Sequence, residues 1–212
     1  MTSKKPGIIF LVVLVSVVTI LASSGWSAFP ETRSGFKAGG GLASIFGLDT
    51  FGQDWQESLA GGVFLDLKIW NKLHLEPEAI WFRKGSVYRL SLDQSEYREK
   101  LILDYLELPV LVKFYFLDLP GHKIYLCGGP SAALNLRARL KVTFDGLEES
   151  VEVDNLKGTD FLLNAGAGTE IKLKSGFIII ELRYGHGMKS ISTETEGDVR
   201  NKNLVILAGY KF

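Results

Sequence analysis

Hydrophobic and polar residues alternate along most of the chain after residue 35, with the period of two that β-strands show. In residues 203–212 every second position is apolar or aromatic, and the last two such positions are Tyr210 and Phe212. A soluble strand rarely needs two aromatic residues on one face at its end, whereas a strand that ends at a membrane–water interface does. This stretch therefore predicts the closing strand of a transmembrane β-barrel.

The same alternation predicts eight strands in all. They cover residues 35–45, 58–69, 73–84, 101–116, 123–140, 159–173, 177–188 and 203–212. The odd-numbered connections contain roughly 12 to 18 residues and the even-numbered ones roughly 3 to 6, the sorting that separates long extracellular loops from short periplasmic turns. We therefore predict an all-β domain over residues 35–212, an eight-stranded antiparallel up-and-down transmembrane β-barrel in the bacterial outer membrane.

Residues 1–28 have the layout of a secretory signal peptide. Lys4 and Lys5 precede an apolar run of 15 residues, 8–22, and small residues follow, so we expect cleavage somewhere between Ser24 and Ala28. An uncleaved membrane anchor is the alternative, although 15 apolar residues are few for a spanning helix.

Composition narrows the remaining choices. Removal of the leader leaves 22 basic against 24 acidic residues, and nothing in this balance points to nucleic acid as a partner. Cys127 is the only cysteine, which excludes an intrachain disulfide in this exported chain. A closed, hydrogen-bonded barrel would supply the stability that disulfides give to many exported proteins.

The ionisable residues of most predicted strands have the opposite parity from the apolar residues, so they are expected to point into the barrel. These predicted lumen residues are six acids and five bases: Asp66, Lys68, Glu76, Glu78, Glu107, Lys113, Arg137, Glu170, Lys172, Glu181 and Arg183. An eight-stranded barrel is just wide enough to be filled by side chains. We therefore expect these charges to pair with one another and close the lumen.

Other polar groups allow a catalytic interpretation. The glutamates on either side of Pro77 could serve acid–base chemistry or bind a metal, but pairing with lumen bases explains them more simply. His186 precedes Ser190 and Ser192 near the predicted outer rim, and barrel enzymes use such residue types. The parity of His186 matches that of Tyr184, which is predicted to face lipid, so we expect an interfacial position. We predict no catalytic, cofactor-binding or metal-binding residues.

Two segments carry a family resemblance, residues 75–85 (LEPEAIWFRKG) and residues 105–116 (YLELPVLVKFYF), and the terminal Tyr-Lys-Phe adds to it. On these segments the chain from about residue 35 to residue 212 resembles the outer-membrane β-barrel family called porin-family or PorT-like, a Bacteroidetes-type outer membrane protein β-barrel domain. The resemblance implies a small closed barrel. It also implies insertion by the barrel-assembly machinery, which reads a C-terminal aromatic strand, so Tyr210 and Phe212 would form the assembly signal.

The sequence thus predicts a protein without catalytic activity or cofactor. Its role would be structural, binding or secretion-associated and would reside in the extracellular loops. The expected partners are outer-membrane lipid, the barrel-assembly machinery and a secretion or envelope protein, and the PorT branch of the resemblance suggests a link to secretion or gliding. Two alternatives stay open, a barrel enzyme that modifies lipid or cleaves peptides, and a narrow solute pore.

Overall fold

The computed structural model describes residues 31–47, 53–92, 95–153, 156–193 and 198–212. The predicted signal peptide, residues 1–28, lies outside these residues. The described residues form ten strands: β1 (Thr32–Phe46), β2 (Gln53–Asp54), β3 (Gln56–Lys68), β4 (Leu73–Leu92), β5 (Ser95–Leu119), β6 (His122–Phe144), β7 (Leu147–Glu152), β8 (Thr159–Lys172), β9 (Phe177–Gly187) and β10 (Arg200–Lys211). No helix in the described part of the chain is both long and apolar enough to cross a membrane.

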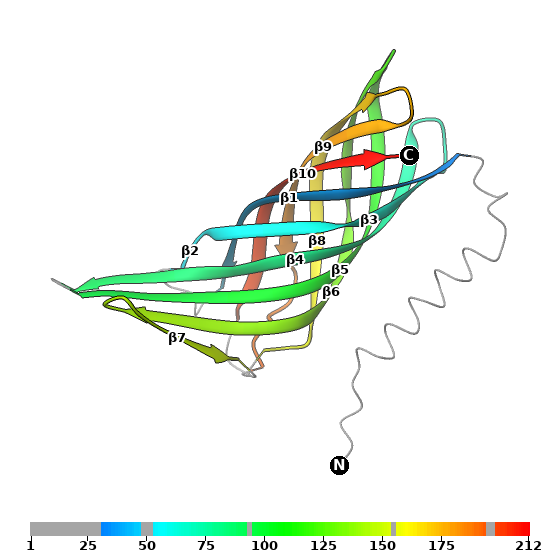
Figure 1. Cartoon of the computed structure of the whole chain (residues 1–212). Coiled ribbons are helices and arrows are strands. Elements are labelled where there is room, and N and C mark those ends of the chain that lie inside the picture. The colour runs from blue at the N-terminus through cyan, green and yellow to red at the C-terminus, as the bar shows by residue number, and fades with distance from the viewer. Residues whose placement is uncertain (1–30, 48–52, 93–94, 154–155, 194–197) are drawn as a thin grey trace.

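Eight of these strands form a closed antiparallel ring, which confirms the predicted barrel (Figure 1). β1 pairs with both β3 and β10, with Phe36 opposite Tyr210, and the β4–β5 pairing completes the ring. The remaining two strands are short and lie outside the ring. β2 pairs with β4, and β7 pairs with β6. The beginning of β1, the end of β10 and the short turns lie at one end, which is the periplasmic end in bacterial barrels.

The strands β4, β5 and β6 continue well beyond the predicted membrane span. The sequence pattern placed loops at residues 85–100 and 141–158, and this was wrong, because β4 and β5 stay paired out to Leu92 and Ser95 and β6 continues to Phe144 and pairs with β7. Polar side chains on a sheet that extends into water can form hydrogen bonds with water, so a polar sequence is compatible with strands as well as with a loop. We call residues 85–92, 95–102, 137–144 and 147–152 the protruding sheet.

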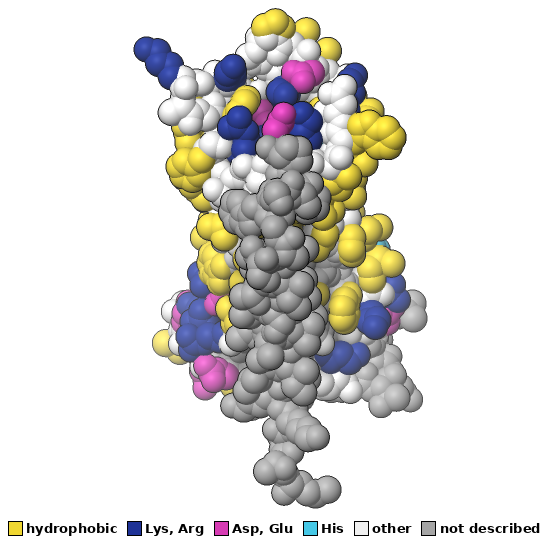
Figure 2. All heavy atoms as spheres, turned by 90° about the vertical axis from the view of Figure 1, so that its right-hand side faces the viewer, with side chains coloured by type: hydrophobic (Ala, Val, Ile, Leu, Met, Phe, Trp, Pro, Cys, Tyr) yellow, Lys and Arg dark blue, Asp and Glu magenta, His cyan; other side chains and the backbone are white. Residues whose placement is uncertain are grey.

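Residues alternate between the barrel interior and its outer surface along the regularly paired parts of the ring strands. On β10, for example, Val205 and Leu207 are fully buried while Leu204 and Ile206 are 41% and 59% exposed. Figure 2 shows the outer surface, where hydrophobic side chains form a band at mid-height and Lys and Arg side chains lie both above and below it. This band is the surface that lipid covers in an outer-membrane barrel.

A β-bulge interrupts the alternation on β6. Tyr105 of β5 pairs with Asn135 and the preceding Asp104 pairs with Arg137, so Leu136 is an extra residue without a partner in this register. After the bulge Ala138 packs against the interior, and Arg137 points outward. A shift of one residue exchanges the two faces of a strand.

Candidate functional site: an ion network inside the barrel

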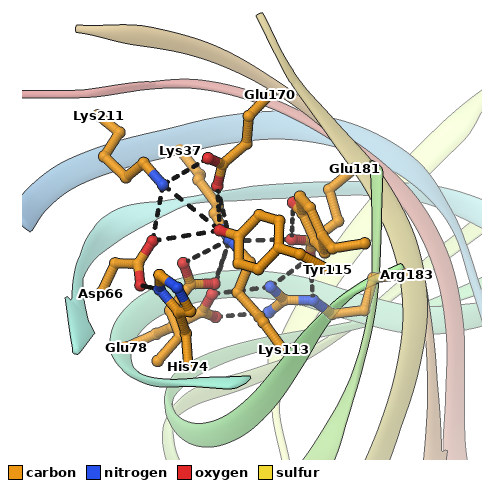
Figure 3. A network of polar contacts seen from close by, with 12 residues as sticks. Lys37, Asp66, His74, Glu78, Lys113, Tyr115, Glu170, Glu181, Arg183 and Lys211 are labelled. Atoms are coloured by element: carbon orange, nitrogen blue, oxygen red, sulfur yellow. Dashed lines mark hydrogen bonds and ion pairs between the residues drawn. The ribbon is translucent and has the colours of Figure 1, made fainter. Parts of the chain in front are cut away.

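Nine charged side chains from seven ring strands meet in the periplasmic half of the lumen (Figure 3). They are four bases and five acids: Lys37, Lys113, Arg183 and Lys211, and Asp66, Glu76, Glu78, Glu170 and Glu181. None of these side chains is more than 4% exposed. We call these nine residues the ion network.

Lys37 on β1 holds three acids together. Its Nζ donates to Glu76 Oε1 at 2.7 Å, to Glu78 Oε1 at 2.9 Å and to Glu181 Oε2 at 3.0 Å. An ammonium group has three protons to donate, so this site uses all of them. Gly209 lies beside the lysine stem, since a Cβ there would come 2.9 Å from Lys37 Cγ.

Arg183 on β9 joins two of the same acids. Its Nη1 and Nη2 donate to the two oxygens of Glu78 at 2.5 and 2.8 Å, and its Nε donates to Glu181 Oε1 at 2.7 Å. The two parallel bonds to Glu78 form the bidentate arrangement that a planar guanidinium makes with a carboxylate. A lysine at this position could not reproduce it.

Lys113 and Lys211 extend the network toward the periplasm. Lys113 Nζ donates to Glu76 Oε2 and to Glu170 Oε1, each at 3.0 Å, and it lies 3.9 Å from the centre of the Tyr125 ring. Lys211 Nζ donates to Asp66 Oδ2 at 2.7 Å and to Glu170 Oε2 at 2.5 Å. Each base therefore bridges acids from different strands.

Three neutral or titratable partners complete the arrangement. Tyr115 and Tyr125 donate their hydroxyl protons to Glu170 and Glu181, each at 2.7 Å, and His74 Nδ1 lies 2.5 Å from Asp66 Oδ1. The nine charges leave one excess acid. This end of the network borders a small cavity of about 80 Å³ at the periplasmic mouth.

Glycines on the inner face provide the space for these large side chains. A Cβ added to Gly168 would lie 2.4 Å from the phenol ring of Tyr125, and a Cβ on Gly35 would lie 2.4 Å from the ring of Phe64. Neither ring could keep its position if these residues were alanine. The glycine-rich inner face and the long inner side chains are therefore complementary in size.

A separate buried ion pair lies in the extracellular half of the lumen. Lys84 Nζ binds Glu107, and it lies 4.9 Å from the centre of the Phe82 ring and 5.9 Å from that of Tyr105. Hydrophobic residues such as Ile80, Leu103 and Val205 pack around this pair, together with neutral polar side chains such as Asn201 and Asn203. The two halves of the lumen thus differ, since one holds a network of ions and the other mixes apolar and neutral polar side chains around a single ion pair.

The structure brings seven predicted lumen residues together in the ion network: Asp66, Glu76, Glu78, Lys113, Glu170, Glu181 and Arg183. Glu107 is buried, but in the separate pair with Lys84. Lys68 lies at the periplasmic rim, where its Nζ donates to Glu31 at 2.9 Å. This hydrogen bond lowers the pKa of Glu31 below its ordinary value.

Two predicted lumen residues are placed wrongly. Arg137 is exposed on the outside because the bulge at Leu136 reverses the parity of β6, and its Nη2 donates to Glu152 at 3.0 Å. Lys172 has the inward parity but is the last residue of β8, so it extends past the barrel wall and is exposed. Simple alternation cannot detect a bulge or the end of the wall.

Three buried bases were missing from the prediction. Lys37 lies on a strand whose glycines hide the alternation, while Lys84 was placed at the end of a predicted strand. Lys211 has the opposite parity from Tyr210 and Phe212, so the sequence contained the signal that it points inward.

The structure gives His186 an interfacial environment. Its Nδ1 lies 3.2 Å from the hydroxyl oxygen of Tyr184, and its ring centre lies 4.7 Å from that of Phe46. The hydroxyl oxygen of Ser190 accepts hydrogen bonds from the backbone N–H groups of Ser192 and Val199 at 3.3 and 3.2 Å. Within the described residues, no three His, Cys, Asp or Glu side chains are grouped as a metal site would require.

Residues 32–193 match the family described as outer membrane protein beta-barrel domain, and the chain belongs to this family. It is a bacterial outer-membrane protein. No curated protein matches the chain in sequence.

Solved structures with a similar fold include three outer-membrane proteins. Ail, the attachment invasion locus protein of Yersinia pestis, is 14% identical with a TM-score of 0.45, and the match covers 86% of this chain and 99% of Ail. Neisserial surface protein A is 14% identical with a TM-score of 0.44 and the same two coverages, 86% and 99%. The outer membrane protease OmpT from Escherichia coli is 10% identical with a TM-score of 0.36 over 85% of this chain and 95% of OmpT.

Proposed function

We propose that this small outer-membrane barrel is closed and non-catalytic, and that it presents the protruding sheet to an extracellular binding partner. The observation that carries the proposal is the ion network. It crosses the lumen with side chains that are at most 4% exposed, so a solute would have to separate several buried ion pairs to pass. A filled lumen argues against a pore, which leaves the extracellular surface as the functional part.

The inward face of the protruding sheet supports a binding role. At its tip a row of cross-strand partners joins Leu90, Tyr97, Phe144 and Leu147. Leu90, Phe144 and Leu147 are 40%, 47% and 78% exposed. Neighbouring apolar and aromatic residues on an exposed surface are typical of sites that bind another macromolecule. The partner we infer is an extracellular or envelope protein with an apolar contact surface.

Two measurements on the full chain test this proposal. In planar bilayers the purified protein should show no stable single-channel conductance, and stable conductance would contradict the closed lumen. On intact cells, a photo-crosslinking side chain at Leu147 should capture a discrete partner, whereas the same side chain at the periplasmic residue Lys174 should not capture it. Absence of any crosslink from Leu147 would contradict the binding role.

A narrower role in secretion is supported only by the resemblance to the PorT-like branch. Deletion of the gene should then reduce the amount of exported protein in the culture medium. The enzyme alternative predicts that His186→Ala abolishes a lipid A-modifying or peptidase activity. The proposal includes neither of these enzymatic activities. If the original protein had one of them and His186→Ala lost it, the enzyme alternative would replace the proposal.

We further propose that Tyr210 and Phe212 act as the assembly signal. Their rings lie 5.2 Å apart, and both contact Phe36 of the neighbouring strand with ring centres 6.5 and 6.3 Å away. Deletion of Phe212 should slow insertion into the outer membrane, measured by the appearance of the heat-modifiable folded band. Phe36→Leu, which removes the aromatic contact from the other strand, is the matched control and should insert at the normal rate.

A further inference from the structure

The outward face of the protruding sheet is strongly basic, in contrast to the apolar band next to it. Above the bulge at Leu136, the outward positions of β2 and of β4 to β7, together with the Arg83–Asp104 pair, carry seven bases and four acids among the side chains that the structure describes. The bases are Arg83, Arg89, Arg98, Lys100, Arg137, Arg139 and Lys141, and the acids are Asp54, Asp104, Glu148 and Glu152. The same outward side thus changes from apolar to cationic within a few residues.

Two arginines at the lower edge of this face surround a single carboxylate. Arg83 Nε donates to Asp104 Oδ1 at 2.8 Å and its Nη2 donates to Oδ2 at 3.3 Å. The Nη2 atom of Arg139, from the other side, lies 3.9 Å from Asp104 Oδ2. The two carboxylate oxygens of Asp104 therefore lie between two guanidinium groups.

The position of this pair along the strands is the level of the lipid head groups. Trp81, two residues below Arg83 on the same face, lies under its guanidinium at 5.2 Å from ring centre to Cζ. Leu136, the bulge residue beside Arg137, is 59% exposed and is the last apolar residue at this point of β6. Tryptophan marks the membrane interface in such barrels, and basic residues just beyond it meet the phosphates of the leaflet.

We propose that this outward basic face binds the phosphate groups of phosphorylated lipids in the outer leaflet, with Arg83 and Arg139 as its central residues. A phosphate offers the same paired oxygens as Asp104 and satisfies guanidinium groups bidentately. The excess of bases over acids leaves cationic groups for phosphate after the internal pairs are counted. This face is the opposite one from the apolar face that the proposed function uses, so the two proposals fail independently.

Binding of fluorescent lipid A to the full chain in neutral detergent micelles tests the proposal. The double variant R83Q/R139Q should bind about thirtyfold more weakly, because each basic group near a lipid surface contributes roughly a fivefold change in affinity. The variant K72Q/K174Q, which removes two exposed lysines at the periplasmic turns, should bind like the original protein. Unchanged affinity of R83Q/R139Q would overturn the proposal.

A change in the opposite direction separates phosphate binding from a structural role. Asp104→Asn removes the internal anion and should tighten lipid A binding by about fivefold. If the arginines only stabilise the sheet through Asp104, this variant should weaken binding or leave it unchanged, and either result would refute the proposal. The variant also decides the question if R83Q/R139Q does not fold.

Controls with other probes identify the source of the phosphate. Dephosphorylated lipid A should bind poorly, and equal binding would show that the acyl chains alone are recognised. Inorganic phosphate should compete only at far higher concentration than lipid A. Equal potency of the free ion would show a simple anion site and overturn the assignment to a lipid head group.

Discussion

The barrel wall and the protruding sheet are made from the same strands, yet their two faces have opposite character. Within the barrel, β4 to β6 direct ions such as Glu76 and Lys113 inward and apolar residues such as Val112 outward. Beyond it the inward face carries Phe144 and the outward face carries Lys141. The difference shows that the surroundings of each face, rather than strand propensity, determine its composition: packed side chains or lipid in one region, water and head groups in the other.

Removing one base from the ion network should produce the largest decrease in the free energy of unfolding among the variants that compare the two regions. Arg183→Met leaves Glu78 and Glu181 without their guanidinium partner inside the barrel. The loss of one member of a buried ion pair costs about 3–5 kcal/mol, and we expect a decrease of this size in the free energy of unfolding by urea in lipid vesicles. Arg183→Met combined with Glu78→Gln restores the charge balance and should recover much of the loss. Equal stabilities of the single variant and the original protein would contradict a stabilising network.

A charge placed on the lipid face should cost somewhat less, and its cost should depend on depth. Ile206→Arg introduces a cation in the middle of the apolar band and should lower the unfolding free energy by about 2–4 kcal/mol. Leu136→Arg, at the edge of the band, should cost about 0–1 kcal/mol. The same urea titration in vesicles measures both. Similar costs at the two positions would mean that the outward side does not change character at the bulge.

On the inward face of the protruding sheet a charge should hardly change stability. Leu147→Asp replaces a side chain that is 78% exposed, so we expect a change within about 0.5 kcal/mol. Val205→Asp, at a fully buried inward position of the barrel, is the matched substitution and should impair folding strongly. A large loss for Leu147→Asp would show that this face packs against the protein itself.

The smallest expected effect is the loss of one ion pair in the β6–β7 hairpin at acidic pH. Lys141 donates a hydrogen bond to Glu148, and this bond with the adjacent positive charge lowers the pKa of Glu148 below its ordinary value. The contribution of the pair is therefore present above the ordinary glutamate pKa and is lost as pH falls through the lowered value. Amide NMR signals of residues 147–152 in nanodiscs should shift in this acid range. The same shift in Glu148→Gln would assign it to another group.

The sequence was sufficient for the ring and for most of the ions within it, because alternation with a period of two distinguishes inside from outside. It was insufficient for Lys37, whose strand has too many glycines to show a period, and for Arg137, which follows a bulge. The protruding sheet was also missed, since exposed polar residues occur in strands and in loops alike. Which ion contacts which depends on side-chain geometry across the lumen, and spacing along one strand does not contain that information.

The extra residue on β6 also has a consequence for how the chain tolerates changes in length. Deleting Leu136 would remove the bulge and keep every other side chain on its present face, because Asn135 and Arg137 already pair with the consecutive residues Tyr105 and Asp104. Deleting a regularly paired residue such as Ala138 would instead move Arg139 and Lys141 to the inward face. The bulge therefore gives β6 one position at which the strand can lose a residue and still keep its basic side chains oriented toward the membrane.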